Sequence, residues 1–277
     1  MALPIEKLGT RYEERTEAID AERAKAYAAA TNDDNPAYES GKYAPPVFGV
    51  VPTWDAMLLS AADVIPPDAL PFIVHGEQDM HFHQALVPGT VLTTAAEAYN
   101  VRVGSSGTRF TSRIVSNDPS GKLVMEVFST TFIRGMNDGE SGGPDKPDHS
   151  MPAAPGDPVA TFTVHVDDDQ TYRYRDASGD TMPIHVDDAF AKSVGLPGII
   201  VHGLCTMAMC SQAVVKTVAG GDPGRLRRLA VRFSKPVLPG NDVTTTIYDL
   251  GGGEYAFEAS SNGETVIKDG RAEVAPA

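Results

Sequence analysis

The sequence is poor in cysteine, in tryptophan and in positive charge. Its 277 residues include two cysteines and one tryptophan, and 23 Lys and Arg stand against 37 Asp and Glu, for a formal net charge of −14. A nucleic-acid-binding protein normally presents a basic surface, so we expect no nucleic-acid partner. Cys205 and Cys210 are spaced for neither a disulfide nor a shared metal, which predicts two buried free thiols in a reducing cytoplasm.

Long apolar runs are also missing. No stretch approaches the ~18 consecutive apolar residues that cross a membrane. The first residues lack the apolar core of a secretory signal, and the last ones are not a peroxisomal address. We therefore expect a soluble, cytoplasmic protein without a membrane partner.

Glycine and proline gather in one segment, roughly residues 135–158, where periodic apolar residues stop. Such a composition is typical of a linker. It predicts an N-terminal domain at residues 1–135, a linker at 136–158 and a C-terminal domain at 159–277, each of ordinary domain size.

The two flanks of this linker repeat each other. HFHQALVPGTVLTT at 81–94 aligns with RFSKPVLPGNDVTT at 232–245 at an offset of 151, and NDDNPAY at 32–38 aligns with GDTMPIH at 179–185 at an offset of 147. Phe48-Gly49 then corresponds to His202-Gly203. Three matches in the same order indicate an internal duplication.

Each flank also shows the same order of expected elements. Short helices are expected at 20–31 and 187–194, capped by Asp20 and Asp187, and longer apolar helices at about 52–64 and 203–219. Strands are expected at about 72–83, 90–102, 108–117, 122–134, 227–237, 242–250, 254–261 and 264–273. This order predicts an α+β fold in which each long helix is wrapped by a curved antiparallel sheet.

The segment SGDTMPIH at 178–185 carries the residues best suited to chemistry. Asp180 and His185 flank a turn stiffened by proline, and HGLCT at 202–206 then starts the long apolar helix. A carboxylate and an imidazole that reach one water form a general acid–base pair, although either residue alone is more often a turn or packing residue. The Gly203 N–H, at a helix start, suits an oxyanion. Which of Asp180 and His185 is acid or base stays open.

Together these motifs resemble the R-specific enoyl-CoA hydratases, also called hydratase 2 or MaoC-like dehydratases. The similar segments are DTMPIH at 180–185, VHGLCT at 201–206 and RFSKPVLPG at 232–240, and HGEQ at 75–78 is similar to a segment of the two-domain members. The resemblance implies a double hot-dog fold with a catalytic C-terminal half and an N-terminal half that accommodates the acyl chain. It implies reversible hydration of trans-2-enoyl-CoA to (3R)-3-hydroxyacyl-CoA, no cofactor besides the coenzyme A of the substrate, and a homodimer.

One departure from the family pattern affects the expected site, and the first half lacks the histidine. Met182 stands where the family usually has Asn, and because Met cannot hydrogen-bond the turn, we expect a differently held loop or an unusual substrate. In the first half, Asp33 persists but Tyr38 replaces the histidine. A phenol with a pKa of ~10 is a poor base, so we expect a degenerate site there.

Several further residues have two interpretations. We assign Arg232, Lys235, Met182 and His202 to substrate binding. Arg232 and Lys235 suit the phosphates of coenzyme A, but they are equally consistent with solvated strand charges, and His202 is also consistent with packing or hydrogen bonding.

Alternatives to hydration and to a metal-free site also remain. The histidines 75, 81 and 83 favour strand packing or cleft lining over a metal site, and 167–169 is expected to be a solvated loop. The alternatives to a hydratase are a hot-dog acyl-CoA thioesterase and a non-catalytic acyl-CoA-binding or partner subunit.

Overall fold

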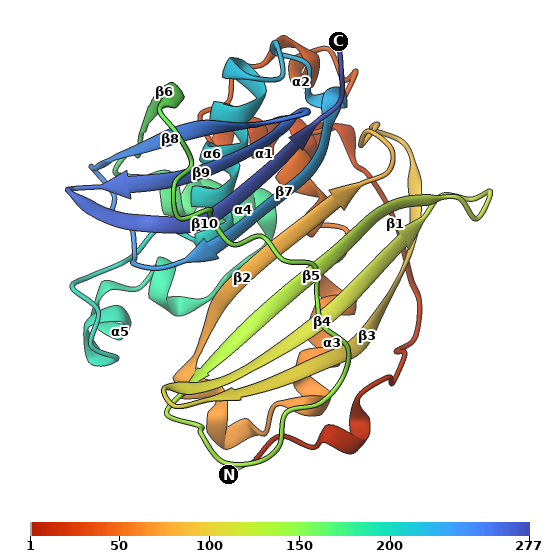
Figure 1. Cartoon of the computed structure of the whole chain (residues 1–277), viewed down its shortest axis with the longest axis vertical. Coiled ribbons are helices and arrows are strands. Elements are labelled where there is room, and N and C mark those ends of the chain that lie inside the picture. Colours follow the sequence, from red (N-terminus) through yellow and green to blue (C-terminus); the bar gives the residue numbers. More distant parts are fainter. Residues whose placement is uncertain (1) are drawn as a thin grey trace.

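The protein is built on one continuous antiparallel sheet of ten strands, seen in a computed structural model that describes residues 2–277 (Figure 1). The strand order is β1-β3-β4-β5-β2-β7-β10-β9-β8-β6, so each half of the chain supplies five adjacent strands. The strands are β1 Arg15–Ala18, β2 Ile73–Phe82, β3 Val91–Gly104, β4 Gly107–Asn117, β5 Leu123–Arg134, β6 Pro158–His165, β7 Leu226–Phe233, β8 Asp242–Gly251, β9 Glu254–Ser261 and β10 Glu264–Val274.

The two halves meet where β2 pairs with β7 around a local two-fold axis. The paired residues are Glu77 with Arg232, Asp79 with Ala230 and His81 with Arg228. Adding 151 to a β2 residue number gives the corresponding residue of β7, so this pairing maps onto itself. The repeats are therefore joined by backbone hydrogen bonds inside one sheet, and the largest cluster of buried apolar side chains draws on both of them.

Two longer helices lie on the same side of this sheet (Figure 1). Helix α3, Trp54–Val64, contacts β3 and β4, and helix α6, Gly203–Thr217, contacts β6, β7 and β8. Helix α6 is the more deeply buried, with every residue from Leu204 to Val215 buried. This matches the expected α+β architecture, in which an apolar helix is wrapped by a curved sheet.

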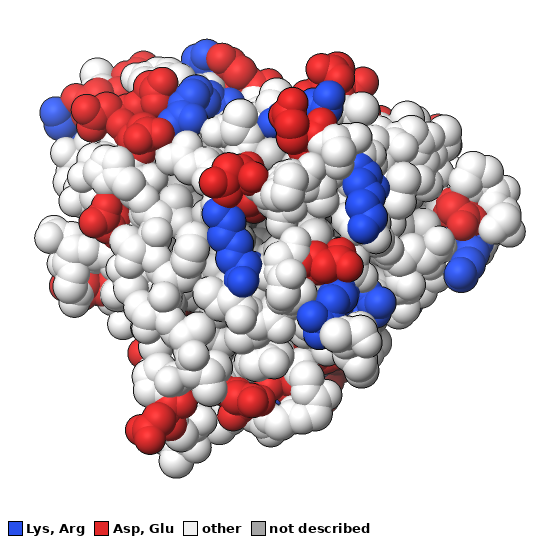
Figure 2. Space-filling model, turned by 90° about the horizontal axis from the view of Figure 1, so that it is seen from above, with Lys and Arg blue, Asp and Glu red and all other residues white. Residues whose placement is uncertain are grey.

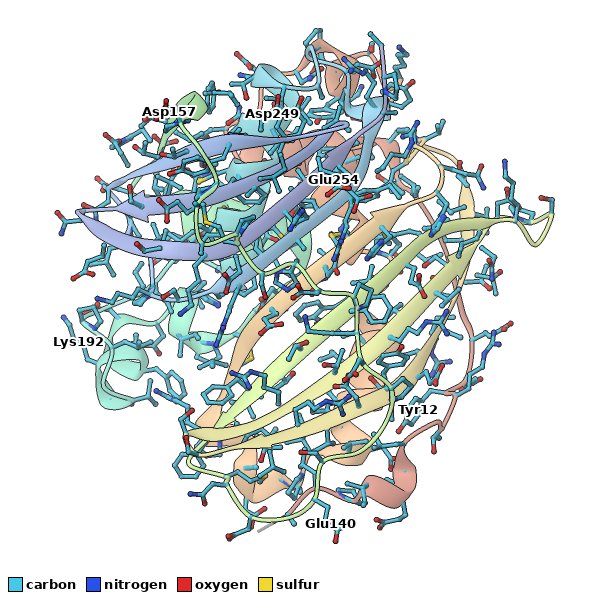
Figure 3. The ribbon with its side chains drawn as sticks, viewed as in Figure 1. Tyr12, Glu140, Asp157, Lys192, Asp249 and Glu254 are labelled. Carbon is cyan, nitrogen blue, oxygen red and sulfur yellow. The ribbon has the colours of Figure 1, made fainter. Side chains whose placement is uncertain are left out.

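Two further helices, α1 at Ala21–Ala30 and α4 at Gln170–Ser178, pack against each other. The hydroxyl groups of Tyr27 and Tyr174 lie 3.0 Å apart, and these residues differ by the repeat offset of 147. Helix α2, Pro36–Glu39, and helix α5, Asp188–Ser193, are short. Helix α5 stands out from the body of the molecule, with Lys192 at its surface (Figure 3).

The eight expected strands and four expected helices are all present, and the side chains of Asp20 and Asp187 cap α1 and α5 as expected. Two strands and two α-helices were missed, namely β1, β6, α2 and α4. The pairing of α5 with α1 as repeat counterparts was wrong, because α4 is the counterpart of α1. The strand expected at 227–237 ends at Phe233.

The segment between β5 and β6, residues 135–157, runs across the outer face of the sheet (Figure 1). The Arg228 guanidinium donates to the Asp148 carbonyl at 2.9 Å, and the His149 ring donates to the Asp269 carbonyl at 2.7 Å. The expected linker bounds lie close to the end of β5 and the start of β6. The division into separate domains stays a prediction, since both halves build one sheet.

The surface charge, the helices and the two cysteines agree with what the composition predicted. Patches of Asp and Glu gather on the face shown in Figure 2, with fewer Lys and Arg between them. Among residues 2–277, no helix combines the length and the apolar character needed to cross a membrane. Cys205 and Cys210 are free and buried as expected, and burial raises the pKa of Cys210 to about 12.

Candidate active site

The turn after α4 fixes the position of Asp180. Gly179 ends the helix with a φ of 85°, a left-handed conformation that glycine adopts readily. The Asp180 carboxylate then accepts a hydrogen bond from the Met182 backbone N–H at 3.1 Å. The loop is thus held by the backbone of residue 182, while the Met182 side chain is 49% exposed. This explains how the turn persists without the usual asparagine.

His185 is buried and held in one tautomer. Its Nδ1–H donates to the Ile200 carbonyl at 2.7 Å, and because a carbonyl only accepts, the opposite nitrogen, Nε2, carries a free lone pair. Burial lowers the pKa of His185, against the opposing effects of the Ile200 carbonyl and the Asp180 charge. The ring is therefore neutral and able to accept a proton at neutral pH.

The structure brings Asp180 and His185 together. A carboxylate oxygen of Asp180, a ring nitrogen of His185 and a ring nitrogen of His202 all lie within 4.8 Å of one another. A single water can bridge a carboxylate and an imidazole at such a separation. The expected convergence of the two groups is thus present, and their catalytic roles are taken up below as a proposal.

His202 contacts both members of this pair. Its ring stacks on His185 with centroids 3.8 Å apart and planes 24° apart, and its Nε2–H donates to the Asp180 backbone carbonyl at 3.1 Å. Burial, followed by the neighbouring His185, lowers the pKa of His202 to about 3. His202 therefore stays neutral, and its contacts fit the packing and hydrogen-bonding interpretation rather than direct substrate binding.

The same three residues, Asp180, His185 and His202, are also the candidate ligands for a metal ion. Stacked imidazoles, however, direct their in-plane lone pairs side by side, whereas a tetrahedral ion needs lone pairs that converge. Nε2 of His202 is also engaged with the Asp180 carbonyl. The arrangement suits proton transfer better than metal binding.

Gly203 is the first residue of α6, directly after His202. The first N–H groups of a helix have no partner within it, so they are free to meet a negatively charged oxygen. A methyl group at this position would lie 3.2 Å from the Phe233 ring. The ring thus lies directly against Gly203.

Two residues expected to bind substrate, Arg232 and Lys235, form ion pairs with acidic side chains. Arg232 points to the opposite face of β7 from Phe233, with its Nε 3.8 Å from a Glu77 carboxylate oxygen and its Nη1 3.5 Å from Asp269. Strand alternation turns Arg232 away from Phe233, and its ion pairs fit the strand-charge interpretation, so a role in substrate binding stays a prediction. Lys235 is exposed and forms an ion pair with Glu264, so its role stays a prediction.

Known families match both halves of the chain. The MaoC-like domain family matches residues 150–268, and the FAS1-like dehydratase domain region matches residues 6–127. A probable enoyl-CoA hydratase 2 of Dictyostelium discoideum is 30% identical over 74% of this chain and 70% of its own. The 3-hydroxyacyl-thioester dehydratase Y of Mycobacterium tuberculosis is 33% identical over 73% of this chain and 72% of its own. The chain belongs to the MaoC-like dehydratase family.

This MaoC-like chain is shorter than some relatives. It spans only 36% of the peroxisomal multifunctional enzyme type 2 of Drosophila melanogaster, which is 33% identical over 74% of this chain. A solved MaoC-like dehydratase from Phytophthora capsici has a TM-score of 0.88 at 26% identity, covering 98% of this chain and 97% of its own. A Mycobacterium tuberculosis protein described as a double hotdog fold has a TM-score of 0.58 at 14% identity, covering 97% and 96%. The expected double hot-dog fold is confirmed.

The N-terminal repeat of this MaoC-like dehydratase retains a trace of the site. Asp33 lies in a cleft of about 480 Å³ together with Tyr38, and burial raises the pKa of Asp33 to about 6. Burial also raises the pKa of Tyr38, and its hydroxyl has no hydrogen-bond partner among the described residues. A methyl group at Gly49, the counterpart of Gly203, would lie 2.7 Å from the Met125 sulfur. The space above Gly49 is therefore filled.

Two residues beside the C-terminal site received no catalytic assignment from the sequence, namely Phe233 and His75. Phe233 belongs to the repeated RFSKPVLPG motif, which was the available signal. His75 was considered with His81 and His83 and assigned to strand packing or cleft lining. In the structure His81 is on the outer face, 3.1 Å from Asp79, and His83 is exposed, whereas the His75 ring packs against Phe233.

Proposed function

We propose that the protein adds water to the double bond of a trans-2-enoyl-CoA, giving the (3R)-3-hydroxyacyl-CoA, and catalyses the reverse dehydration. The observation that carries the proposal is the convergence of Asp180 and His185 within 4.8 Å, with Nε2 of His185 left unprotonated. Membership of a family whose relatives are named enoyl-CoA hydratase 2 and 3-hydroxyacyl-thioester dehydratase supports the reaction. The (3R) hand rests on the resemblance alone.

The chemistry follows from these groups. The water oxygen bonds to the β-carbon, one water proton passes to the Asp180–His185 pair, and the pair delivers a proton to the α-carbon. Such general acid–base catalysis contributes ~10²–10⁴ in rate. Negative charge that builds on the thioester oxygen is met by the Gly203 N–H, and one such donor contributes ~10²–10³. The reaction transfers no electrons, so the proposal requires no cofactor beyond the coenzyme A of the substrate.

The test is a hydration assay with trans-2-enoyl-CoAs of graded chain length, followed by the loss of enoyl-thioester absorbance. Asp180→Asn and His185→Gln should each lower kcat by about a hundredfold or more, because each removes one member of the acid–base pair. The matched controls are Asp34→Asn and His83→Gln, which change exposed residues and should retain activity. Full activity in both catalytic variants, with unchanged circular dichroism, would overturn the assignment.

The same assay separates the alternatives. A thioesterase would release free coenzyme A from a saturated acyl-CoA, which a thiol reagent detects. A non-catalytic acyl-CoA binder would bind the enoyl-CoA in calorimetry and leave its absorbance unchanged. Chiral separation of the product distinguishes the (3R) from the (3S) hydroxyacyl product.

The proposal also covers the oligomeric state, the cellular location and the contact with coenzyme A. The homodimer rests on the resemblance, and sedimentation of the purified chain tests it. The cytoplasm is proposed because Cys205 and Cys210 are free thiols, although relatives named peroxisomal exist, and imaging of a tagged chain tests it. Contact of Lys235 with a coenzyme A phosphate predicts a higher KM for Lys235→Ala with unchanged kcat.

A further inference from the structure

The C-terminal site has one wall that comes from the N-terminal repeat. His75, on β2, packs its ring against Phe233 with centroids 4.8 Å apart, and the Phe233 ring stands against Gly203. Burial lowers the pKa of His75, and the nearby Asp180 charge opposes this change. His75 therefore faces the site, although Asp180, His185 and Gly203 all belong to the other repeat.

A β-bulge turns His75 toward the site. The pairing of β2 with β5 shifts between His75 and Glu77, so Gly76 is an extra residue in the strand. In a regular strand, in which residue 76 occupies its own place in the ladder, alternation would put His75 on the outer face with Glu77. With it, His75 joins the face of Gln78, and its Nε2 lies 3.0 Å from the Gln78 side-chain oxygen. A bulge beside an active site commonly re-aims a side chain in this way.

The same bulge recurs in β7 with different residues. The pairing of β7 with β10 shifts between Leu226 and Arg228, which lies 151 positions after the bulge in β2. Leu226 therefore takes the place of His75, and Leu229 takes the place of Gln78. Both leucines are buried in the core. The fold itself thus accepts an apolar pair here, and the polar pair occurs only on the side of Asp180 and His185.

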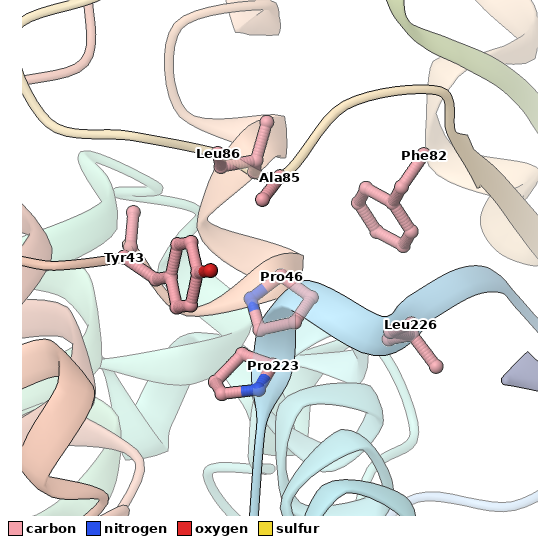
Figure 4. Close-up of a pocket in the computed structure, with 8 residues that line it drawn as sticks. Tyr43, Pro46, Phe82, Ala85, Leu86, Pro223 and Leu226 are labelled. Carbon is pink, nitrogen blue, oxygen red and sulfur yellow. The ribbon is translucent and has the colours of Figure 1, made fainter. Parts of the chain in front are cut away.

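The side with the leucines has a small cavity next to Leu226. Leu226 and Phe82, the counterparts of His75 and Phe233, line a cavity of about 10 Å³ together with Tyr43, whose hydroxyl points into it (Figure 4). Such a volume holds about one water. The space above Gly49 is filled by Met125 as well. Leucines thus line the degenerate side next to Gly49, whereas His75 and Gln78 line the side with the acid–base pair.

We propose that His75 is a positioning residue of the C-terminal active site. Its hydrogen bond with Gln78 holds the imidazole in one orientation, the imidazole holds the Phe233 ring, and the ring sets the space in which a thioester oxygen meets the Gly203 N–H. This inference rests on the proposed function, which brings the thioester to Gly203. Catalytic groups act best when neighbouring side chains fix the geometry before the reaction begins.

The experiment replaces His75 and Gln78 with the leucines that occupy the corresponding positions of β7. His75→Leu, Gln78→Leu and the double variant reproduce the pair that the fold already accepts in β7, and His83→Leu is the matched control. The measurements are kcat, KM, the dissociation constant of a saturated acyl-CoA and the melting temperature. Each single variant should lower kcat about tenfold with KM and binding within about threefold, since one hydrogen bond is lost. The double variant should also lose about tenfold, because both changes remove the same contact.

Three outcomes would overturn the inference: wild-type kcat in His75→Leu, independent losses that multiply to about a hundredfold in the double variant, or a lower kcat that appears only with a matching loss of melting temperature. The control should keep wild-type kcat. Wild-type protein and Asp180→Asn are assayed alongside. If the wild type does not hydrate enoyl-CoA, both proposals fail, whereas active wild type, inactive Asp180→Asn and fully active His75→Leu refute only the role of His75.

Discussion

Because His202 is buried and neutral, it should lower the free energy of unfolding at acidic pH. The substitution His202→Phe should remove this effect. The side chain is 1% exposed, and its pKa is lowered to about 3 by burial and by His185. In an unfolded chain a histidine titrates near ~6.5. Phenylalanine is the matched replacement, because the N-terminal repeat has Phe48 at the corresponding position and packs it against Tyr27.

The magnitude follows from the two pKa values. Between about pH 6.5 and pH 3 the unfolded chain binds a proton at His202 that the folded chain does not, so the free energy of unfolding falls as the pH falls through this window. One pKa unit corresponds to ~1.36 kcal/mol. A pH of 5 lies about 1.5 units below the pKa of histidine in the unfolded chain. His202 should therefore lower the free energy of unfolding at pH 5 by about 2 kcal/mol relative to pH 8.

The assay is urea unfolding at pH 8 and pH 5, followed by the fluorescence of Trp54, the one tryptophan of the chain. From pH 8 to pH 5, the free energy of unfolding of the wild type should fall by about 2 kcal/mol more than that of His202→Phe. His83→Phe, which replaces an exposed histidine, should keep the wild-type pH dependence. Equal losses in the wild type and His202→Phe would show that His202 is not held neutral, and the reasoning would be refuted.

Three other substitutions test separate parts of the structure. Gly203→Ala places a methyl group 3.2 Å from the Phe233 ring and should lower kcat by about tenfold or more, which unchanged turnover would contradict. Tyr38→Phe should leave kcat and circular dichroism unchanged, and loss of most activity in a folded variant would show that the N-terminal repeat is not degenerate. Arg228→Met removes the guanidinium that pairs with the buried Asp79, leaves the His81 ring as the remaining partner of that carboxylate, and should lower the urea-derived free energy of unfolding by ~3–5 kcal/mol, whereas a loss below ~1 kcal/mol would contradict a structural role.

The parts of the fold that sequence patterns predicted are those with local causes. Alternating strands bounded by turn signals, such as β8 and β9 around Gly251–Gly253, depend on neighbouring residues alone. Helix α4 was missed because its sequence, QTYRYRDAS, is mostly polar. Only some of its side chains, such as Tyr174, are buried against the rest of the protein. Strands β1 and β6 were missed because they are sheet edges with largely exposed side chains.

The candidate site shows the same division. Asp180, His185 and Gly203 were predicted because their types and their spacing within one repeat are typical of an acid–base pair beside a helix start. The face of Arg232 depends on strand alternation relative to Phe233, and the position of His75 depends on a bulge and on pairing between repeats more than 100 residues apart. Neither can be read from residue spacing, since the contacts that decide them are formed only when the two repeats join.

The strand junction between the repeats also has a consequence for stoichiometry. Because β2 and β7 belong to one polypeptide, the two halves cannot exchange partners as free subunits would. Under the proposed function, each chain therefore contains one catalytic half and one degenerate half. An inhibitor that mimics the enolate should therefore titrate at one equivalent per 29.4 kDa chain in any oligomer. The two-fold symmetry of the repeats is kept in the pairing of β2 with β7, and the proposed function assigns turnover to one repeat alone.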